Sequence, residues 1–342
     1  MSAAILWSDS HQTTLDDLLC AALPDVLPNH PRVASITPVA TPGGYHASVR
    51  RITLSTGESV FAKRHLFARM ALNQSYDLLA VEEEVTRLLA REKCHVPQVL
   101  GVIVEAGVVI LRDVGRRTLD DAIQQDPPVK CTRLATEAVD AFAHIQKILA
   151  THPDTDRLVA PGCEPDSVRQ SFLDVRSVLE HENLRALVCI DDGLSGIVND
   201  LGELVESLAE LPTLIGPTDY NARNIVISDT GSPFFLEWSK IGHDWPERRL
   251  VQYLTSLGTG QPGASHKSLI DQWLIKQYSE AAVWTEPKMA AFALDGHHLV
   301  FTVLAALRSL ASDFSLSTEF KRGLTTPLSA NPQITRLRKA LG

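Results

Sequence analysis

The spacing of hydrophobic and polar positions changes along the chain, and the first third is typical of β-strands. Residues 32–39, 47–54 and 59–64 are short runs rich in β-branched and apolar residues, and turn sequences with Gly separate them. Such runs are typical of an antiparallel meander. Two further apolar runs, 98–104 and 108–111, flank a Glu-Ala-Gly turn and predict another hairpin. We therefore expect five antiparallel strands.

A helical pattern occurs once between the expected strands, and helical patterns predominate in the chain after them. Residues 74–92 carry apolar side chains at spacings that place them on one helix face. After Asp113 the pattern is mostly helical. The expected helices cover residues 132–149, 167–187, 195–208, 247–257, 268–281 and 288–311. The fold class is therefore α+β.

The order of these patterns predicts two lobes behind a short extension. Residues 1–30 have a helical pattern that a Pro-rich stretch ends, and we treat them as an N-terminal helical extension. Residues 31–113 would form a β-rich N-lobe with one helix. Residues 114–342 would form a mostly helical C-lobe.

Composition favours a folded protein with a small-molecule partner over a nucleic-acid-binding protein. A chain of 342 residues with 44% hydrophobic content can bury a sizeable core. Its net charge of −9 argues against nucleic acid as the main partner and favours a cationic small molecule. Its five cysteines lack the spacing of a metal site or a disulfide framework, which suggests a reducing compartment. Because the sequence shows no signal peptide and no long apolar run, we expect a cytoplasmic protein without a membrane partner.

The most informative stretch for chemistry covers residues 217–238. A polar loop runs into an apolar strand, turns, and enters a second apolar strand that ends in an acidic residue. This hairpin would bring together Asp219, Asn224 and Glu237. Phosphoryl transfer requires such a set, namely a carboxylate for the attacking hydroxyl and oxygen ligands for magnesium. The spacing of Asp219 and Asn224 matches the D-x-x-x-x-N pattern of kinase catalytic loops.

This stretch resembles the aminoglycoside phosphotransferase and choline kinase family, whose members read approximately H-G-D-x-x-P-x-N, then a strand, then I-D-W. The resemblance implies a bilobal protein-kinase-like fold that uses ATP and Mg²⁺. It also implies that Asp219 is the catalytic base and that Asn224 and Glu237 bind magnesium. Three departures stand out. Pro217-Thr218 replaces His-Gly, Glu237 replaces the metal-binding aspartate, and Arg223 replaces a glycine and would form a loop salt bridge or neutralise transferring charge.

The same resemblance predicts a lysine in the N-lobe that binds the nucleotide phosphates and a helix glutamate that holds it. Lys63 ends the apolar run Val60-Phe61-Ala62. On a helical wheel of residues 74–92, Glu82 borders the apolar arc while Glu83 points away from it. We therefore expect Glu82 to pair with Lys63, although a solvated acidic cluster is the alternative.

Two further segments would contact the nucleotide. Gly43 and Gly44 lie between the first two strands, where the backbone could approach phosphates closely, although a plain hairpin turn explains them almost equally well. Leu111 and Asp113 lie in a stretch that resembles the family's lobe hinge, where backbone groups would meet adenine.

The sequence thus predicts an ATP-dependent phosphotransferase that acts on a hydroxyl of a small amine-bearing molecule, similar to an aminoglycoside, choline or a natural product. Two alternatives stay open. One is a catalytically impaired nucleotide-binding or regulatory protein, and the other is transfer of a different group from ATP, such as a nucleotidyl group. We expect the protein to act as a monomer or a homodimer.

Overall fold

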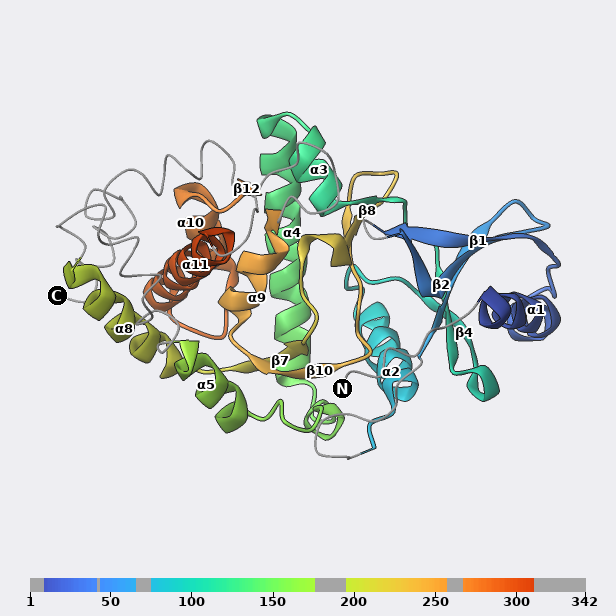
Figure 1. The fold of residues 1–342 in the computed structure, drawn as a ribbon, viewed down its shortest axis with the longest axis horizontal. Helices are drawn as coiled ribbons and strands as arrows, with labels where there is room; N and C mark the ends of the chain where they lie inside the picture. The colour runs from blue at the N-terminus through green and yellow to red at the C-terminus, as the bar shows by residue number, and fades with distance from the viewer. Residues whose placement is uncertain (1–8, 42–43, 66–74, 176–194, 257–266, 311–342) are drawn as a thin grey trace. The chain divides into compact units, whose positions relative to one another are not determined.

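The computed structural model describes residues 9–41, 44–65, 75–175, 195–256 and 267–310, and the chain divides into two compact units (Figure 1). The first unit is Met1–Val114 and the second is Gly115–Gly342. Across the described ranges, no helix has both the length and the apolar character that crossing a membrane requires.

The first unit contains the expected five-stranded antiparallel sheet. Its strands are β1 (Val33–Thr41), β2 (Gly44–Leu54), β3 (Ser59–Arg64), β4 (Val99–Ile103) and β5 (Val108–Arg112). They lie in the order β1-β2-β3-β5-β4. The predicted strands are confirmed, with ends that differ by a few residues from the apolar runs.

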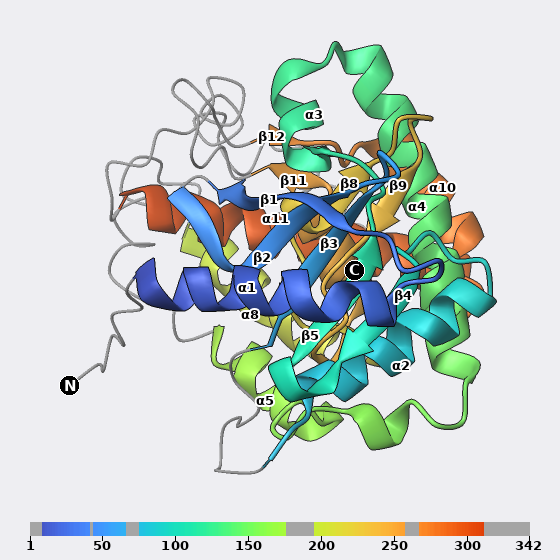
Figure 2. The same cartoon turned by 90° about the vertical axis from the view of Figure 1, so that its right-hand side faces the viewer.

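Two helices lie on opposite faces of this sheet. Helix α1 (Asp9–Val26) packs its leucines onto Val60, Ala62 and Ile110. Side chains alternate between the faces of a strand, so Phe61 and Leu111 point the other way, towards the face that α2 (Leu78–Arg91) covers. Figure 2 shows α1 lying across the strands. Lys63 follows Phe61 by two residues and therefore belongs to the face of α2.

The predicted N-terminal extension contributes to this core. Four leucines of α1 and the residues after it are fully or almost fully buried, namely Leu15, Leu19, Leu23 and Leu27. Arg50 of β2 is also buried and its Nε donates to Asp16 of α1 at 2.9 Å. Residues 9–27 are thus an integral part of the first unit. The described part of this unit therefore contains helix α1 as well as the expected α2.

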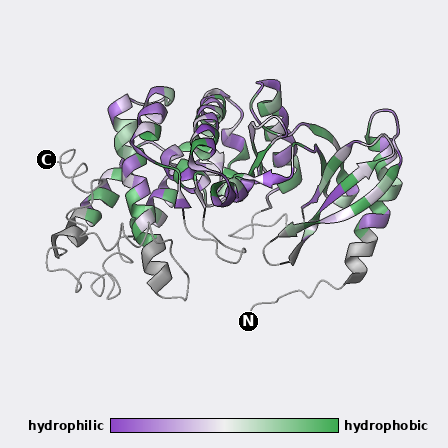
Figure 3. Ribbon diagram, turned by 90° about the horizontal axis from the view of Figure 1, so that it is seen from above, coloured by the Kyte–Doolittle hydropathy of each residue, from purple (hydrophilic) through white to green (hydrophobic). Residues whose placement is uncertain are grey.

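The second unit is mostly helical. Its helices are α3 (Leu119–Gln125), α4 (Pro128–Thr151), α5 (Pro165–Leu173), α8 (Ser195–Ala209), α9 (Pro246–Tyr253), α10 (Gln272–Ala281) and α11 (Pro287–Leu310). These helices carry both hydrophobic and hydrophilic residues, as amphipathic helices around a core do (Figure 3). A buried cluster joins α5, α8 and α11 through Phe172, Leu204, Trp245 and Val300. Part of the predicted helix 167–187 lies outside the described residues.

Short strands complete the second unit. β6 (Arg117–Thr118), β8 (Ile225–Ile227) and β9 (Pro233–Phe235) form one sheet, β7 (Leu214–Pro217) pairs with β10 (Ile241–Asp244), and β11 (Thr255–Ser256) pairs with β12 (Lys267–Ser268). The last pair corrects two predictions. The helix expected at 247–257 ends at Tyr253, and the helix expected from 268 begins after its N-cap Asp271. Thr255 and Ser256, expected at the end of the first helix, and Ser268, expected at the start of the second, instead pair as strands β11 and β12.

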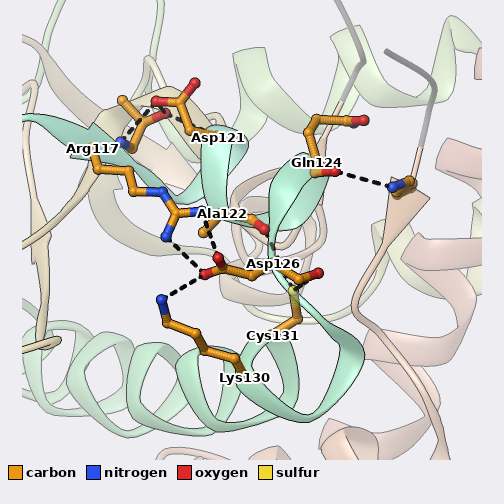
Figure 4. Close-up of polar contacts among 9 residues, drawn as sticks. Arg117, Asp121, Ala122, Gln124, Asp126, Lys130 and Cys131 are labelled. Carbon is orange, nitrogen blue, oxygen red and sulfur yellow. Dashed lines mark hydrogen bonds and ion pairs between the residues drawn. The ribbon is translucent and has the colours of Figure 1, made fainter. Parts of the chain in front are cut away.

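The connection from β6 into α4 is fixed by polar contacts (Figure 4). Arg117 donates to both carboxylate oxygens of Asp126 at 2.8 Å, and Lys130 forms a second ion pair with the same carboxylate. The thiol of Cys131 donates to the carbonyl oxygen of Ala122. Burial raises the pKa of this thiol, which agrees with a structural role.

Candidate active site

The polar loop between β7 and β8 carries the predicted catalytic aspartate. Strand β7 ends at Pro217, and the loop then passes through Asp219 and Tyr220 before a single turn of 3₁₀-helix, η5 (Ala222–Asn224), leads into β8. Antiparallel pairing with β10 places Pro217 opposite Ile241, and Thr218 N donates to Lys240 O at 3.1 Å. The loop therefore begins from a paired strand.

The β8–β9 hairpin pairs the two chain segments that carry the predicted metal ligands Asn224 and Glu237. Ile225 pairs with Phe235, and one step beyond that pair Leu236 N donates to Asn224 O at 2.8 Å. Glu237 follows directly after Leu236. The hairpin turn of residues 228–232 thus sets the register that pairs Asn224 with Leu236, the residue directly before Glu237.

Asp219 is exposed and oriented by two amides. Asn221 Nδ2 donates to Asp219 Oδ1 at 3.0 Å, and Asn224 Nδ2 donates to the Asp219 carbonyl oxygen at 3.0 Å. Within the described ranges, Oδ2 of Asp219 accepts no hydrogen bond, and neither does the amide oxygen of Asn224. One carboxylate oxygen and one amide oxygen therefore stay available for a ligand.

Glu237 adopts a backbone conformation that its side chain disfavours. Its φ angle is 67°, in the left-handed region. For a residue that is not glycine this conformation costs roughly 1–2 kcal/mol. The flanking structure enforces it, because Leu236 is held by Asn224 and the indole of the fully buried Trp238 donates to Phe235 O at 3.0 Å. Backbone strain of this kind is concentrated at functional sites.

Arg249 of α9 braces the start of the loop, and sequence reasoning missed it. This fully buried guanidinium donates to the carbonyl oxygens of Pro217 (3.1 Å), Leu214 (3.0 Å) and Gly242 (2.7 Å), and to Gln146 Oε1 (3.0 Å). Burial lowers the pKa of Arg249. The loop has no imidazole at 217, yet its first residues are held from α9. Arg249 carries no distinguishing signal in the sequence, because it stands next to Arg248 in a helix of largely polar residues.

The middle of the loop is held by two further pairs. The hydroxyl of Tyr220 donates to Asp244, which also accepts from Arg248 Nη1 at 3.2 Å. Arg223 Nε lies 3.3 Å from Asp120 Oδ2 of α3. The structure thus contains the loop salt bridge that was one of the two expectations for Arg223.

The first unit contains the predicted pair of Lys63 and Glu82. Lys63 Nζ lies 2.9 Å from Glu82 Oε2 and donates to Oε1 at 3.1 Å. Glu82 is only 2% exposed. The pairing is confirmed, and the role of Lys63 in nucleotide binding stays a prediction.

His65 is a third member of this cluster that the sequence reasoning did not include. Its Nε2 lies 2.6 Å from Glu82 Oε2. Burial alone would raise the pKa of Glu82, but the charge of Lys63 and the hydrogen bond from His65 outweigh it and hold the pKa below its ordinary value. Glu82 is therefore an anion that organises Lys63.

The structure describes three of the four other residues that were predicted to contact the nucleotide. Leu111 is buried in β5 on the α2 face, and Asp113 accepts a hydrogen bond from Arg51 Nε at 2.8 Å. Gly44 is the first residue of β2 and pairs with Thr41. Gly43 lies outside the described residues. The backbone contacts expected for these four residues stay predictions.

The donor set of the second unit fits magnesium. Asn224 and Glu237 offer hard oxygen ligands, the type that Mg²⁺ prefers. The parts of the chain that the structure describes hold no cluster of three or more His, Cys, Asp or Glu residues suited to a metal ion. Magnesium commonly takes one or two protein ligands together with substrate phosphates and water, so a small donor set fits it better than it fits zinc.

Comparison with solved structures gives the fold. The GDP complex of an aminoglycoside 2'-phosphotransferase-IIIa mutant is 14% identical, with 95% of this chain and 98% of that chain covered and a TM-score of 0.54. A choline kinase from Cryptosporidium parvum Iowa II is 12% identical, with 95% and 96% covered and a TM-score of 0.52. No family model and no curated protein matches the sequence. The chain therefore has the protein-kinase-like fold, as predicted.

Proposed function

We propose that the protein is a small-molecule kinase that transfers the γ-phosphate of ATP to a hydroxyl group with the help of Mg²⁺. The observation that carries this proposal is the register of the β8–β9 hairpin, which pairs Asn224 at the end of the Asp219 loop with Leu236, the residue directly before Glu237. A catalytic carboxylate next to two oxygen ligands is the set that phosphoryl transfer uses.

The residues have separate roles in this reaction. Asp219, oriented by Asn221, accepts a hydrogen bond from the acceptor hydroxyl and aligns its oxygen with the γ-phosphorus. Asn224 and Glu237 would hold magnesium, which neutralises charge on the phosphate oxygens. Lys63 pairs with the α- and β-phosphates and is itself positioned by Glu82. Arg249 fixes the backbone from which Asp219 extends.

Two features support an active enzyme over a catalytically impaired relative. Glu237 is kept in a strained conformation, which a protein without need for its carboxylate could relieve with glycine. The Lys63–Glu82 pair is intact, and its carboxylate is buried although burying a charged group is costly. The fold is shared with phosphotransferases that act on aminoglycosides and choline, and the net charge of −9 also favours an amine-bearing acceptor.

The test is a transfer assay with matched variants. Purified protein is incubated with ATP or GTP, Mg²⁺ or Mn²⁺, and a panel of aminoglycosides, amino alcohols, sugars and nucleosides, and the products are identified by mass spectrometry. GTP is included because a protein of the same fold was solved with GDP. Release of nucleoside diphosphate with a phosphorylated acceptor supports the kinase, whereas release of pyrophosphate identifies nucleotidyl transfer.

Variants then separate the roles. We expect Asp219→Asn to lower the transfer rate by ~10²–10⁴-fold while nucleotide binding persists. Asp229→Asn in the exposed hairpin turn is its control and should have no effect. Glu82→Gln should weaken nucleotide binding, whereas Glu83→Gln, whose partner is the exposed Arg87, should not. Nucleotide binding without transfer to any acceptor would instead favour the regulatory alternative.

A further inference from the structure

Tyr253, the last residue of α9, has an unusual hydroxyl group. The side chain is fully buried, and its hydroxyl has no hydrogen-bond partner among the residues that the structure describes. Two other tyrosines of the second unit do have partners: Tyr220 donates to Asp244, and Tyr278 donates to Glu247 Oε1 at 2.6 Å. Buried hydroxyls without a partner are rare and unfavourable, and in a native fold an ordered water, a ligand or a group that moves in the working state supplies the partner.

The ring of Tyr253 packs against both chain segments that carry the candidate carboxylates. Its centroid lies 5.1 Å from that of Phe235 in an edge-on arrangement and 6.3 Å from that of Tyr220. Phe235 precedes Glu237 by two residues, and Tyr220 directly follows Asp219. Tyr253 therefore lies beneath the catalytic loop and beside the end of the β8–β9 hairpin.

The surrounding charges determine what this hydroxyl can do. Burial is the main reason that the pKa of Tyr253 lies far above its ordinary value. The nearby charge of Asp219 raises the pKa further, as do Tyr220 and Glu237, while Arg249 opposes them. The phenol therefore keeps its proton and can donate a hydrogen bond. It cannot serve as the base.

We propose that Tyr253 is a positioning residue of the phosphoryl-transfer site, whose hydroxyl donates a hydrogen bond to Oδ2 of Asp219 when metal and nucleotide are bound. This inference rests on the proposed function. Oδ1 of Asp219 already accepts from Asn221, so the second donor would fix the plane of the carboxylate. Catalytic hydrogen bonds often tighten only in the loaded enzyme.

In the transfer step, the acceptor oxygen bonds to the γ-phosphorus while the bond from that phosphorus to the β–γ bridging oxygen breaks, which releases ADP. The acceptor proton passes to Asp219, and Tyr253 keeps its own proton throughout. Its hydrogen bond favours the ionised carboxylate, the form that can accept the acceptor proton.

The test is Tyr253→Phe, which removes one oxygen and preserves the ring contacts. We expect kcat to fall ~10–100-fold, the loss of one hydrogen bond to a charged group, with little change in KM for the nucleotide. Tyr278→Phe is the matched control: it removes a buried tyrosine hydroxyl bonded to Glu247 and should lower stability while kcat and KM stay unchanged.

The outcomes separate the two proposals. An unchanged kcat in Tyr253→Phe would overturn the role of Tyr253 alone, provided that the wild type transfers phosphate and Asp219→Asn does not. The same result for Tyr253→Phe and Tyr278→Phe would show that the hydroxyl acts only through stability, which also overturns it. A wild-type protein that transfers phosphate to no acceptor would refute the proposed function, and this inference with it.

Discussion

Replacing Arg249 tests whether the second unit depends on the brace that begins the catalytic loop. Arg249→Met keeps much of the side-chain volume and removes the charge and every donor. It leaves four acceptors without their partner: three backbone carbonyl oxygens and Gln146 Oε1. Each buried acceptor without a partner costs about 1–3 kcal/mol, for a gross loss of roughly 4–12 kcal/mol.

The same change also relieves a cost. A buried guanidinium loses its hydration, and that penalty is several kcal/mol per ion. Burial indeed lowers the pKa of Arg249. The difference between the two effects predicts that the free energy of unfolding falls by a few kcal/mol, on the order of 3 kcal/mol. That is a large share of the ~5–15 kcal/mol that stabilises a typical domain.

Urea unfolding followed by tryptophan fluorescence measures this change. Trp238 and Trp245 are buried in the second unit, so their emission reports on its unfolding. Arg249→Lys should fall between the wild type and the Met variant, since one ammonium group cannot reach all four acceptors. Lys276→Met removes a charge that is 76% exposed and should change stability by less than about 0.5 kcal/mol. If Arg249→Met stays within about 1 kcal/mol of that control, the brace contributes little and the reasoning is wrong.

Three further predictions follow from burial and backbone geometry. Burial raises the pKa of Glu247 from 4.5 to about 7, so between these two pH values the folded state binds one more proton than the unfolded state. Stability should fall by roughly 3 kcal/mol as pH rises through this range, and Glu247→Gln should remove that part of the slope in urea unfolding across the range. Gly115→Ala places a Cβ 2.5 Å from Ile227 O at a φ of 151°, so its melting temperature should drop well below that of Gly162→Ala, whose Cβ meets nothing within 4 Å. Glu237→Gly should relieve a positive φ and raise the free energy of unfolding by about 1 kcal/mol while it abolishes magnesium-dependent transfer; unchanged transfer would exclude Glu237 as a ligand.

Local periodicity explains why much of the first unit could be predicted from the sequence. Alternation along β3 assigns Lys63 to the face opposite Ala62, and the wheel of α2 places Glu82 at the edge of its apolar arc. Both patterns are set by neighbouring residues, so the pairing of Lys63 with Glu82 follows once sheet and helix pack together. His65 continues the same alternation, yet its contact depends on the path of the chain after β3, and the sequence pattern does not specify that path.

The braces of the second unit could not be predicted in this way. Arg249 contacts Pro217 across 32 residues and Gln146 across 103, and no periodic pattern links these positions. The strained φ of Glu237 has no signal in composition, because glutamate is a poor residue for that conformation. Contacts of this kind depend on how helices and hairpins meet, which is settled by packing over the whole unit.

Helix α9 offers a physical reason why the unusual residues at the start of the loop need not mean lost activity. Arg249 and Tyr253 are four residues apart and lie on the same face of this helix. Arg249 holds the carbonyl oxygen of Pro217, and Tyr253 packs beneath the loop against Tyr220. Helix α9 therefore supports the loop through two residues, Arg249 and Tyr253, in place of a histidine within the loop itself. A loop held in this way can keep Asp219 in place with proline and threonine before it, since the orientation of Asp219 depends on the rigidity of the backbone that carries it.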